Sequence, residues 1–269
     1  MTEIETSSGD YGEREPIGEL FGRPVYQYLI GARLSFGPEN PGGERSKPSI
    51  RDVWAIDIGR LRISSGGGGG LLNNFDPTGE RSPGHASLRL FDSSSIRVSL
   101  GLRLYSGRAQ VDDGEMAGVP GLQRTVLGRL STSFTLAGEW GGQVALTSDI
   151  LGHGLGRELS FSLGRRWPLS TNTTMSVGLG MTFGDGEHMF ALFGVPPGSA
   201  AADRLGSYEP PAGAKDLSAG FGLVTVLDNH WIIYGGISFA ALLRSASDSP
   251  FVRRTVTNSL SLGLAYRCC

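Results

Sequence analysis

The sequence predicts an all-β protein: a transmembrane, antiparallel, up-and-down β-barrel of about 12 strands, with about 10 as the alternative count. Three observations predict this fold. Apolar residues alternate with small or polar ones through many short segments, most regularly between residues 173 and 266, and this period of two is typical of strands. The opposite face carries Ser, Gly and Thr, which suits a barrel with lipid outside and a polar lumen. Short and long connections alternate, as expected for short periplasmic turns and long extracellular loops.

Bulk composition excludes other classes of protein. Of the 269 residues, 39% are hydrophobic, and no run approaches the roughly 18 apolar residues that a membrane-spanning helix needs. The formal net charge of −2 argues against a nucleic-acid partner. Glycine, with 42 residues, is about twice as frequent as usual, and we expect it in kinked strands, a crowded lumen and long loops.

We expect a flexible tail over residues 1–19 and a single barrel domain over residues 20–269. The tail is acidic and polar, without the apolar segment of a signal peptide. Because the strand pattern predicts a location in the cell outer membrane, we expect this sequence to be a mature form whose signal peptide has been removed.

Taken in order, each predicted strand is a run with one apolar face. The first strand covers residues 25–36, and the segment 37–49 after it reads as a loop from its Gly, Pro and Ser content. Gly59 and Arg60 then allow a tight turn between the second and third strands. The predicted strands are 25–36, around 54–58, 61–64, 86–91, 96–105, 125–137, 143–150, 159–163, 175–183, 215–226, 231–243 and 256–266. Merging the short strands between residues 61 and 91 with their neighbours gives the alternative count.

The connections differ in length and content. Short turns lie near residues 59, 92, 139, 168 and 229, and long loops lie near residues 43, 75, 115, 153, 198 and 249. The five-glycine run 66–70 lacks the GK[ST] ending of a phosphate loop, and no helix pattern follows it, so we predict no nucleotide site there. The longest connection, 184–213, contains one short capped helix over residues 199–205.

Several charged residues alternate with the apolar residues of their strands, so they are expected to face the lumen. An unpaired charge in a narrow lumen is costly, so these side chains either pair with one another, which plugs and stiffens the barrel, or contact water, which favours anions. A barrel of about 12 strands is intermediate in size between small barrels filled by side chains and large porins with a water channel. Its size therefore does not decide whether these charges pair or contact water. The lumen-facing candidates are Arg33, Arg97, Arg103, Arg129, Asp57 and Asp149.

We predict no catalysis, no cofactor and no metal. None of the four histidines has the spacing of a metal site. Ser148 and Asp149 lie near His153 in the sequence, but proximity along the chain does not make a catalytic triad without geometry.

The two cysteines, Cys268 and Cys269, end the sequence. Adjacent Cα atoms lie about 3.8 Å apart, which is shorter than the usual disulfide span, so a bridge between them would be strained. We therefore expect a tail without a role in the fold.

A series of short motifs occupies the later part of the chain, in loops and at strand ends. They are Ser106–Gly107–Arg108 through Gly118, Gly152–His153–Gly154, His188–Met189–Phe190, Phe193–Gly194–Val195, Gly213 to Asp216, Ser247–Asp248–Ser249–Pro250 with Val252, and Gly263 to Arg267. In this order and spacing they resemble the MipA/OmpV family of outer-membrane proteins (MltA-interacting protein-like), well over residues 96–267 and loosely before. The family usually has an aromatic residue after its closing Tyr-Arg, where this sequence has cysteines. The resemblance assigns a set of family-motif loop residues: His188, Met189, Phe193, Gly194, Val195, Asp248, Ser249 and Pro250.

The resemblance implies a closed barrel in contact with outer-membrane lipid, and it carries over no catalytic motif. It implies a scaffold that links a lytic transglycosylase to a bifunctional penicillin-binding protein in murein (peptidoglycan) synthesis, and this is the function that we predict. The alternative is a narrow porin-like solute channel or an adhesin of OmpV type. A soluble β-sandwich is a third class, and the unbroken apolar faces of so many strands weigh against it.

Overall fold

The computed structural model describes residues 26–38, 42–43, 46–65, 85–110, 116–136 and 139–268. The predicted tail over residues 1–19 and the glycine run 66–70 lie outside these ranges. Together the described residues form one closed barrel of antiparallel strands.

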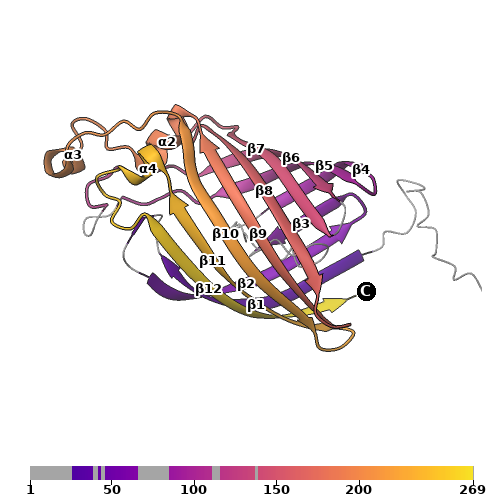
Figure 1. The fold of residues 1–269 in the computed structure, drawn as a ribbon. Helices are drawn as coiled ribbons and strands as arrows, with labels where there is room; N and C mark the ends of the chain where they lie inside the picture. Colours follow the sequence, from indigo (N-terminus) through magenta and orange to yellow (C-terminus); the bar gives the residue numbers. More distant parts are fainter. Residues whose placement is uncertain are drawn as a thin grey trace, which may run out of the picture.

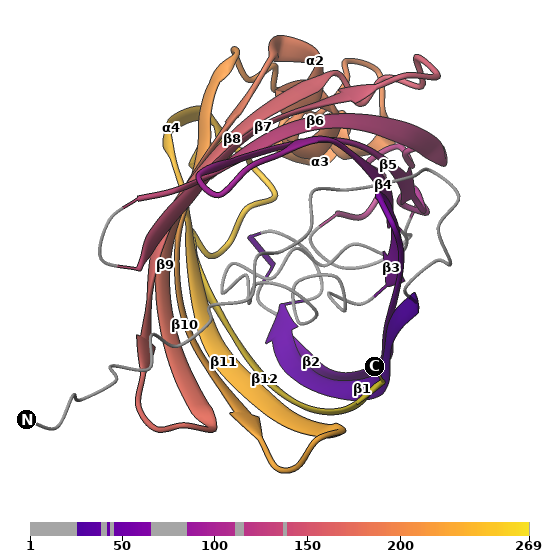
Figure 2. The same ribbon diagram turned by 90° about the vertical axis from the view of Figure 1, so that its right-hand side faces the viewer.

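The barrel has twelve strands, and each pairs with its neighbours in sequence, so the chain meanders once around the wall. Figure 1 shows the strands tilted across the barrel, and Figure 2 shows them as a closed ring seen from the end that carries the C-terminus. The predicted fold class and the larger strand count are confirmed. The strands are β1 (Tyr26–Pro38), β2 (Ser46–Ile58), β3 (Leu61–Ser65), β4 (His85–Asp92), β5 (Ile96–Tyr105), β6 (Thr125–Thr135), β7 (Trp140–Asp149), β8 (Arg157–Pro168), β9 (Thr173–Gly184), β10 (Gly213–Val226), β11 (Trp231–Leu242) and β12 (Val256–Cys268).

The first and last strands close the barrel. Antiparallel pairing of β1 with β12 runs from Tyr28 opposite Cys268 to Phe36 opposite Leu260. The expectation of a tail at the C-terminus was wrong for Cys268, because this residue belongs to β12 and is disulfide-bonded. Hydrogen bonding to β1 carries the strand to the end of the described chain.

The predicted loop 37–49 was also too long. β1 continues to Pro38 and β2 already begins at Ser46, so the two strands pair over thirteen positions, from Tyr26 opposite Ile58 to Pro38 opposite Ser46. The Gly, Pro and Ser content suggested a loop, but the pairing between neighbouring strands overrides this local signal. Similarly, β8 extends to Pro168, and only a short turn remains before β9.

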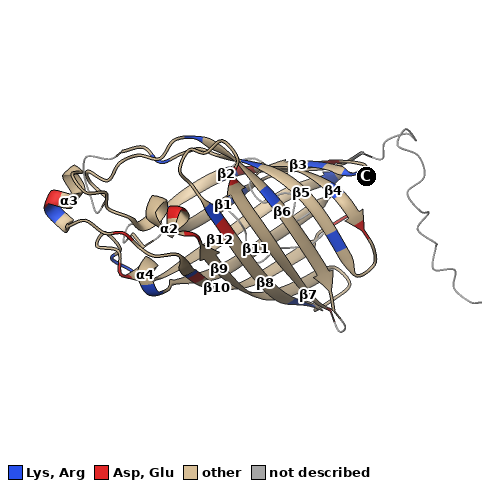
Figure 3. Cartoon of the chain, turned by 90° about the horizontal axis from the view of Figure 1, so that it is seen from above, with Lys and Arg blue, Asp and Glu red and all other residues tan. Residues whose placement is uncertain are grey.

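An apolar outer face surrounds the barrel. Leu34, Leu100 and Leu262 lie on three different strands and are 51%, 48% and 57% exposed, whereas their neighbours along each strand are less exposed. Charged residues form separate patches on a largely uncharged wall (Figure 3). A closed barrel with an apolar outside satisfies its backbone internally and presents to lipid the side chains that lipid favours.

The lumen is not uniformly polar, which differs from the sequence prediction. Leu29, Val53, Ile232, Tyr234 and Ala265 form a buried apolar cluster on the inner face where β1, β2, β11 and β12 meet. These strands carry apolar residues on both faces. Hydrophobicity alone therefore could not show which of the apolar residues face the lumen.

The described residues form three short helices, in the long loops at the end of the barrel opposite the one that carries the C-terminus (Figure 1). They are α2 (Gly186–Phe193), α3 (Ala200–Leu205) and α4 (Arg244–Ser247). The predicted helix at 199–205 is confirmed as α3, with the Ser199 hydroxyl accepting from the Ala202 N–H at its N-terminus. No helix in the described part of the chain is both long and apolar enough to cross a membrane.

Candidate functional sites at the two ends of the barrel

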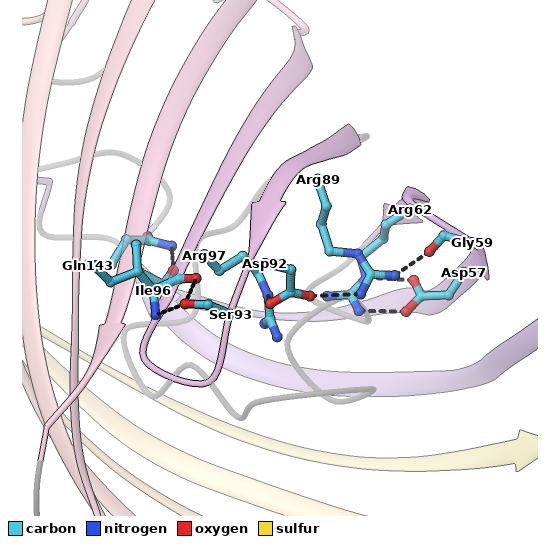
Figure 4. A network of polar contacts seen from close by, with 10 residues as sticks. Asp57, Gly59, Arg62, Arg89, Asp92, Ser93, Ile96, Arg97 and Gln143 are labelled. Atoms are coloured by element: carbon cyan, nitrogen blue, oxygen red, sulfur yellow. Dashed lines mark hydrogen bonds and ion pairs between the residues drawn. The ribbon is translucent and has the colours of Figure 1, made fainter. Parts of the chain in front are cut away.

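The first candidate site is a network of charges on the inner face at the short-turn end (Figure 4). Asp57 near the end of β2 and Arg62 in β3 face each other across the tight turn. The Arg62 Nε and Nη2 atoms each donate to one Asp57 carboxylate oxygen at 2.6 Å. Both side chains are largely buried, so this two-point contact fixes their geometry.

The network continues into the next hairpin. The Asp92 carboxylate accepts from Arg97 Nε at 3.0 Å and from Arg89 Nη1 at 3.2 Å. A second nitrogen of Arg89 donates to the carbonyl oxygen of Gly59, in the turn between β2 and β3. Arg89 therefore ties the β2–β3 turn to the β4–β5 hairpin.

The turn between β4 and β5 is closed by its own bonds. Ser93 Oγ donates to the Ile96 carbonyl oxygen at 3.0 Å and accepts from the Ile96 N–H at 3.1 Å. In the next hairpin, Arg129 donates to Gln143 Oε1 at 3.2 Å, and Gln143 donates to Ser133 Oγ at 3.1 Å. Polar side chains thus follow the inner wall from β2 to β7 near the short turns.

The six candidates that share inward parity do not form one site. Asp57, Arg97 and Arg129 take part in the contacts described above. Arg33 lies nearer the middle of β1, directly opposite Arg51 of β2, and its Nε atom has no hydrogen-bond partner among the described residues. Arg103 lies on β5 between His85 and Leu127 of the neighbouring strands.

Asp149 lies at the opposite end and organises a loop. Its carboxylate accepts from the Thr125 hydroxyl and, at 3.1 Å each, from the N–H groups of Leu151 and Leu155. The residue therefore fixes the start of the β7–β8 connection and the adjoining edge of β6.

Sequence reasoning missed Arg62, Arg89 and Asp92. Arg62 could have been found, because it follows Asp57 across a two-residue turn with the same inward parity. Arg89 and Asp92 could not, because a β-bulge between Arg89 and Phe91 shifts the alternation in β4.

The second candidate site is the assembly of long loops at the other end, defined here as residues 116–122, 185–212 and 243–252. Met116 and Val119 from the β5–β6 loop, Val195 and Ala201 from the β9–β10 loop, and Phe251 from the β11–β12 loop form a buried cluster. The backbone supports this packing, since the Ala201 N–H donates to the Gly118 carbonyl oxygen at 3.3 Å. Three loops thus share one small hydrophobic core.

The family-motif loop residues meet in this assembly. Met189 and Phe193 of α2 pack with Ala246 of α4, and all three are almost completely buried. The buried Ser249 hydroxyl donates to the Phe193 carbonyl oxygen at 2.7 Å, which ties the β11–β12 loop to the end of α2.

The remaining motif residues shape the backbone around this contact. Gly194 ends α2, and a Cβ there would lie 2.5 Å from the Phe190 ring and carbonyl oxygen. Val195 pairs with Tyr208 in an isolated bridge. The Asp248 N–H closes α4 on the Arg244 carbonyl oxygen at 3.1 Å, and Pro250 lies within the turn between Ser249 and Val252.

His188 connects the loop assembly to the barrel wall. Its Nδ1 atom lies 2.9 Å from the Leu155 carbonyl oxygen and its Nε2 atom lies 3.3 Å from the Glu158 carboxylate. Lys215 of β10 also contacts Glu158. Among the described residues, no three His, Cys, Asp or Glu side chains gather as ligands for a metal ion.

Comparison with known proteins gives one family. The family model described as MltA-interacting protein MipA matches residues 30–268. No curated protein matches the chain. Among solved structures, an outer membrane channel from Pseudomonas putida F1 is similar with 11% identity and a TM-score of 0.43, covering 98% of this chain and 100% of that one. The outer membrane protein OmpT of Vibrio cholerae has 9% identity and a TM-score of 0.41 (91% and 97% covered), and an anion-selective porin from Comamonas acidovorans has 9% and 0.40 (91% and 99%).

Proposed function

This outer-membrane β-barrel belongs to the MipA family, and from that premise we propose that it is a structural scaffold for enzymes of murein synthesis and remodelling. The partners that we propose are a lytic transglycosylase, in keeping with the family's description as MltA-interacting, and a bifunctional penicillin-binding protein. The barrel itself acts without catalysis and positions the enzymes beneath the membrane.

One observation carries the proposal: side-chain bonds join two short turns, β2–β3 and β4–β5, to each other. Arg89 bonds to the Gly59 carbonyl of one turn and to Asp92 beside the next, while Asp57 and Arg62 lock the first turn from inside. A surface whose parts are already ordered loses less conformational entropy when a partner binds. The network therefore favours protein binding at this end.

The exposed part of this surface is small and polar. Gly59 and Arg60 form one turn tip, and Ser93, Ser94 and Ser95 form the next, all exposed. Short periplasmic turns are the part of an outer-membrane barrel that a cell-wall enzyme can reach.

The experiment is capture of purified lytic transglycosylase and penicillin-binding protein by the detergent-folded barrel. We expect enrichment by the unmodified protein and its loss in Ser94→Arg, which places a long charged side chain on the turn tip. Ser207→Arg is the control: it makes the same exchange at an exposed position in the loop assembly, and we expect this variant still to capture both enzymes. Enrichment no greater than that of an unrelated barrel would sink the proposal.

A solute channel is the second candidate, and one observation favours it. Arg33 and Arg51 lie directly opposite each other on the inner face of β1 and β2, and Arg51 is exposed. Two adjacent cations beside water attract anions. Single-channel conductance in a planar bilayer tests this: anion-selective steps that shrink when both residues are replaced by Gln support a channel, and a silent inserted barrel contradicts it.

A further inference from the structure

Three side chains gather on the outer face of the barrel at the short-turn end: Trp140, Arg165 and Trp167, named here the Trp–Arg–Trp cluster. Trp140 begins β7 and pairs in register with Arg165 of β8, so the two side chains share a face. Trp167 lies two residues after Arg165 and points the same way. Phe161 and Leu163 have the same parity in β8 and are 41% and 42% exposed, which identifies this face as the outer one.

The Arg165 cation contacts both indole rings. The Arg165 guanidinium carbon is 5.8 Å from the centre of the Trp140 ring and 5.0 Å from that of Trp167. Cation–π contacts of this kind supply no conventional hydrogen-bond acceptor, so the guanidinium N–H groups still lack one.

The donors of the cluster lack protein acceptors. Arg165 Nε is buried without a hydrogen-bond partner, and within the described part of the chain the side chain makes no ion pair. Glu139 precedes Trp140 in the turn but is not paired with Arg165 there. Nε itself is closed off from outside, but the two Nη groups of Arg165 are not among the buried atoms and also have no acceptor among the described residues, so a binding partner from outside the chain is expected to contact them.

The cluster lies at the level of the lipid headgroups. Trp231, the first residue of β11, is 41% exposed and contacts Tyr266 edge-on, with ring centres 5.4 Å apart. Trp140 likewise begins its strand, and rings of this type at strand ends mark the membrane interface. An outward arginine costs little there, whereas it is strongly destabilising at the bilayer centre.

We propose that the Trp–Arg–Trp cluster binds the phosphate of a glycerophospholipid in the periplasmic leaflet of the outer membrane. The guanidinium edge offers two parallel N–H groups that fit two phosphate oxygens. The two indole rings cover the glycerol and the first methylenes of the acyl chains, and their N–H groups supply further donors. The lipid thereby satisfies polar groups that the protein leaves open.

The test is native mass spectrometry of the full-length, detergent-folded protein titrated with phosphatidylglycerol. We expect Arg165→Gln to weaken retention of the first bound lipid about tenfold, because it removes a charge-assisted contact to phosphate. Arg165→Lys keeps the charge without the planar fork and gives an intermediate loss. Arg60→Gln is the matched control, since Arg60 is an exposed arginine in a turn at the same end, and it retains the lipid.

Two further ligands identify the source of the phosphate. Diacylglycerol lacks phosphate and is expected to bind equally weakly to the unmodified protein and to Arg165→Gln. Inorganic phosphate at the same concentration is expected not to displace the lipid. Equal retention of phosphatidylglycerol by Arg165→Gln and Arg60→Gln would overturn the proposal, and so would displacement of the lipid by inorganic phosphate.

Discussion

At the scale of single residues, charged and polar side chains are placed where they hold turns and loops. Asp57 and Arg62 fasten one short turn from inside, Asp149 collects the donors of a long loop, and Ser249 bonds two loops together. Each contact joins segments whose backbone would otherwise be free to move. Losing one is therefore expected to loosen the segments that it joins more than the rest of the barrel.

The Asp57–Arg62 pair gives the first prediction. Arg62→Gln removes the positive charge and one of the two short bonds that it makes to the largely buried Asp57 carboxylate. We expect a loss of about 1 to 3 kcal/mol in the free energy of unfolding, measured by urea titration in detergent. Asp52→Asn in β2 is the control, since Asp52 is exposed. A double-mutant cycle with Asp57→Asn that gives no coupling energy would contradict this interpretation.

Ser249 gives the second prediction. Ser249→Ala deletes the donor to the Phe193 carbonyl oxygen and leaves that acceptor in an apolar environment. Hydrogen exchange in residues 186–205 and 244–252 should become about tenfold faster, while exchange in the strands stays unchanged. Ser207→Ala, an exposed loop position, should leave the exchange pattern as it is. Uniformly faster exchange across the whole barrel would contradict a local role of Ser249 in the loops.

The turn between β10 and β11 gives the third prediction. The N–H groups of Trp231 and then of His230 donate to the Asp228 carboxylate, both at 2.7 Å, and lower the pKa of Asp228 below its ordinary value. Because the folded-state pKa is depressed, the stabilisation is present above the pKa of an unfolded Asp, about 3.9, and is lost as the pH falls through the lower folded-state value.

Carboxyl carbon NMR titration of the folded protein measures that pKa directly. A peptide of residues 226–232 supplies the unfolded reference. We expect the folded-state pKa to be the lower of the two, and Asp228→Asn to remove the matching part of the acid dependence of stability. A folded-state pKa at or above that of the peptide would rule out the hydrogen-bonded turn.

At the scale of elements, glycine decides how closely neighbouring strands approach. A Cβ on Gly31 of β1 would lie 2.2 Å from the Leu264 carbonyl oxygen and 2.6 Å from the Ala265 Cα atom of β12. Both obstacles are backbone atoms, so no rotation of a side chain relieves the overlap. Gly31 therefore permits the pairing that closes the barrel.

Gly31→Ala should prevent or delay closure between β1 and β12. On unheated SDS gels we expect the unmodified protein to migrate as a compact folded barrel, and the variant to migrate mainly as unfolded chain after refolding in detergent. Gly213→Ala in β10 is the matched control, because a Cβ there would meet nothing within 4 Å. A normal folded band for Gly31→Ala would show that the seam can widen without penalty.

The sequence predicted the strands well and the loops only in part. A period of two reports which face is buried, and it places the centre of a strand such as β5 at the correct residues. It does not fix strand ends: Ser46 and Cys268 join strands because a partner strand continues beside them. Helix α2 escaped prediction because its apolar residues Met189 and Phe193 are buried by other loops, a tertiary contact that local composition does not reveal. The hydrogen bonds of Arg89 could not be predicted either, because a β-bulge shifts the alternation of side chains in β4.

At the scale of the whole molecule, the two ends of the barrel differ in construction. One end has short turns fixed by inner-face ion pairs, whereas the other carries loops that pack around shared apolar clusters of their own (Figure 1). The wall between them presents apolar side chains to lipid. The proposed scaffold uses the first end, and the Trp–Arg–Trp cluster lies on the outer face of that same end.

The seam between β1 and β12 also determines when the protein can fold. Residues near 28 must pair with residues near 268, so β1 and β12 cannot pair with each other until β12 has been synthesised. Contacts this distant in sequence form slowly, and open strand edges in the meantime invite aggregation. Shielding of these edges before the barrel closes is therefore expected to favour folding over aggregation. A ribosome-bound chain that lacks only β12 should remain sensitive to protease throughout.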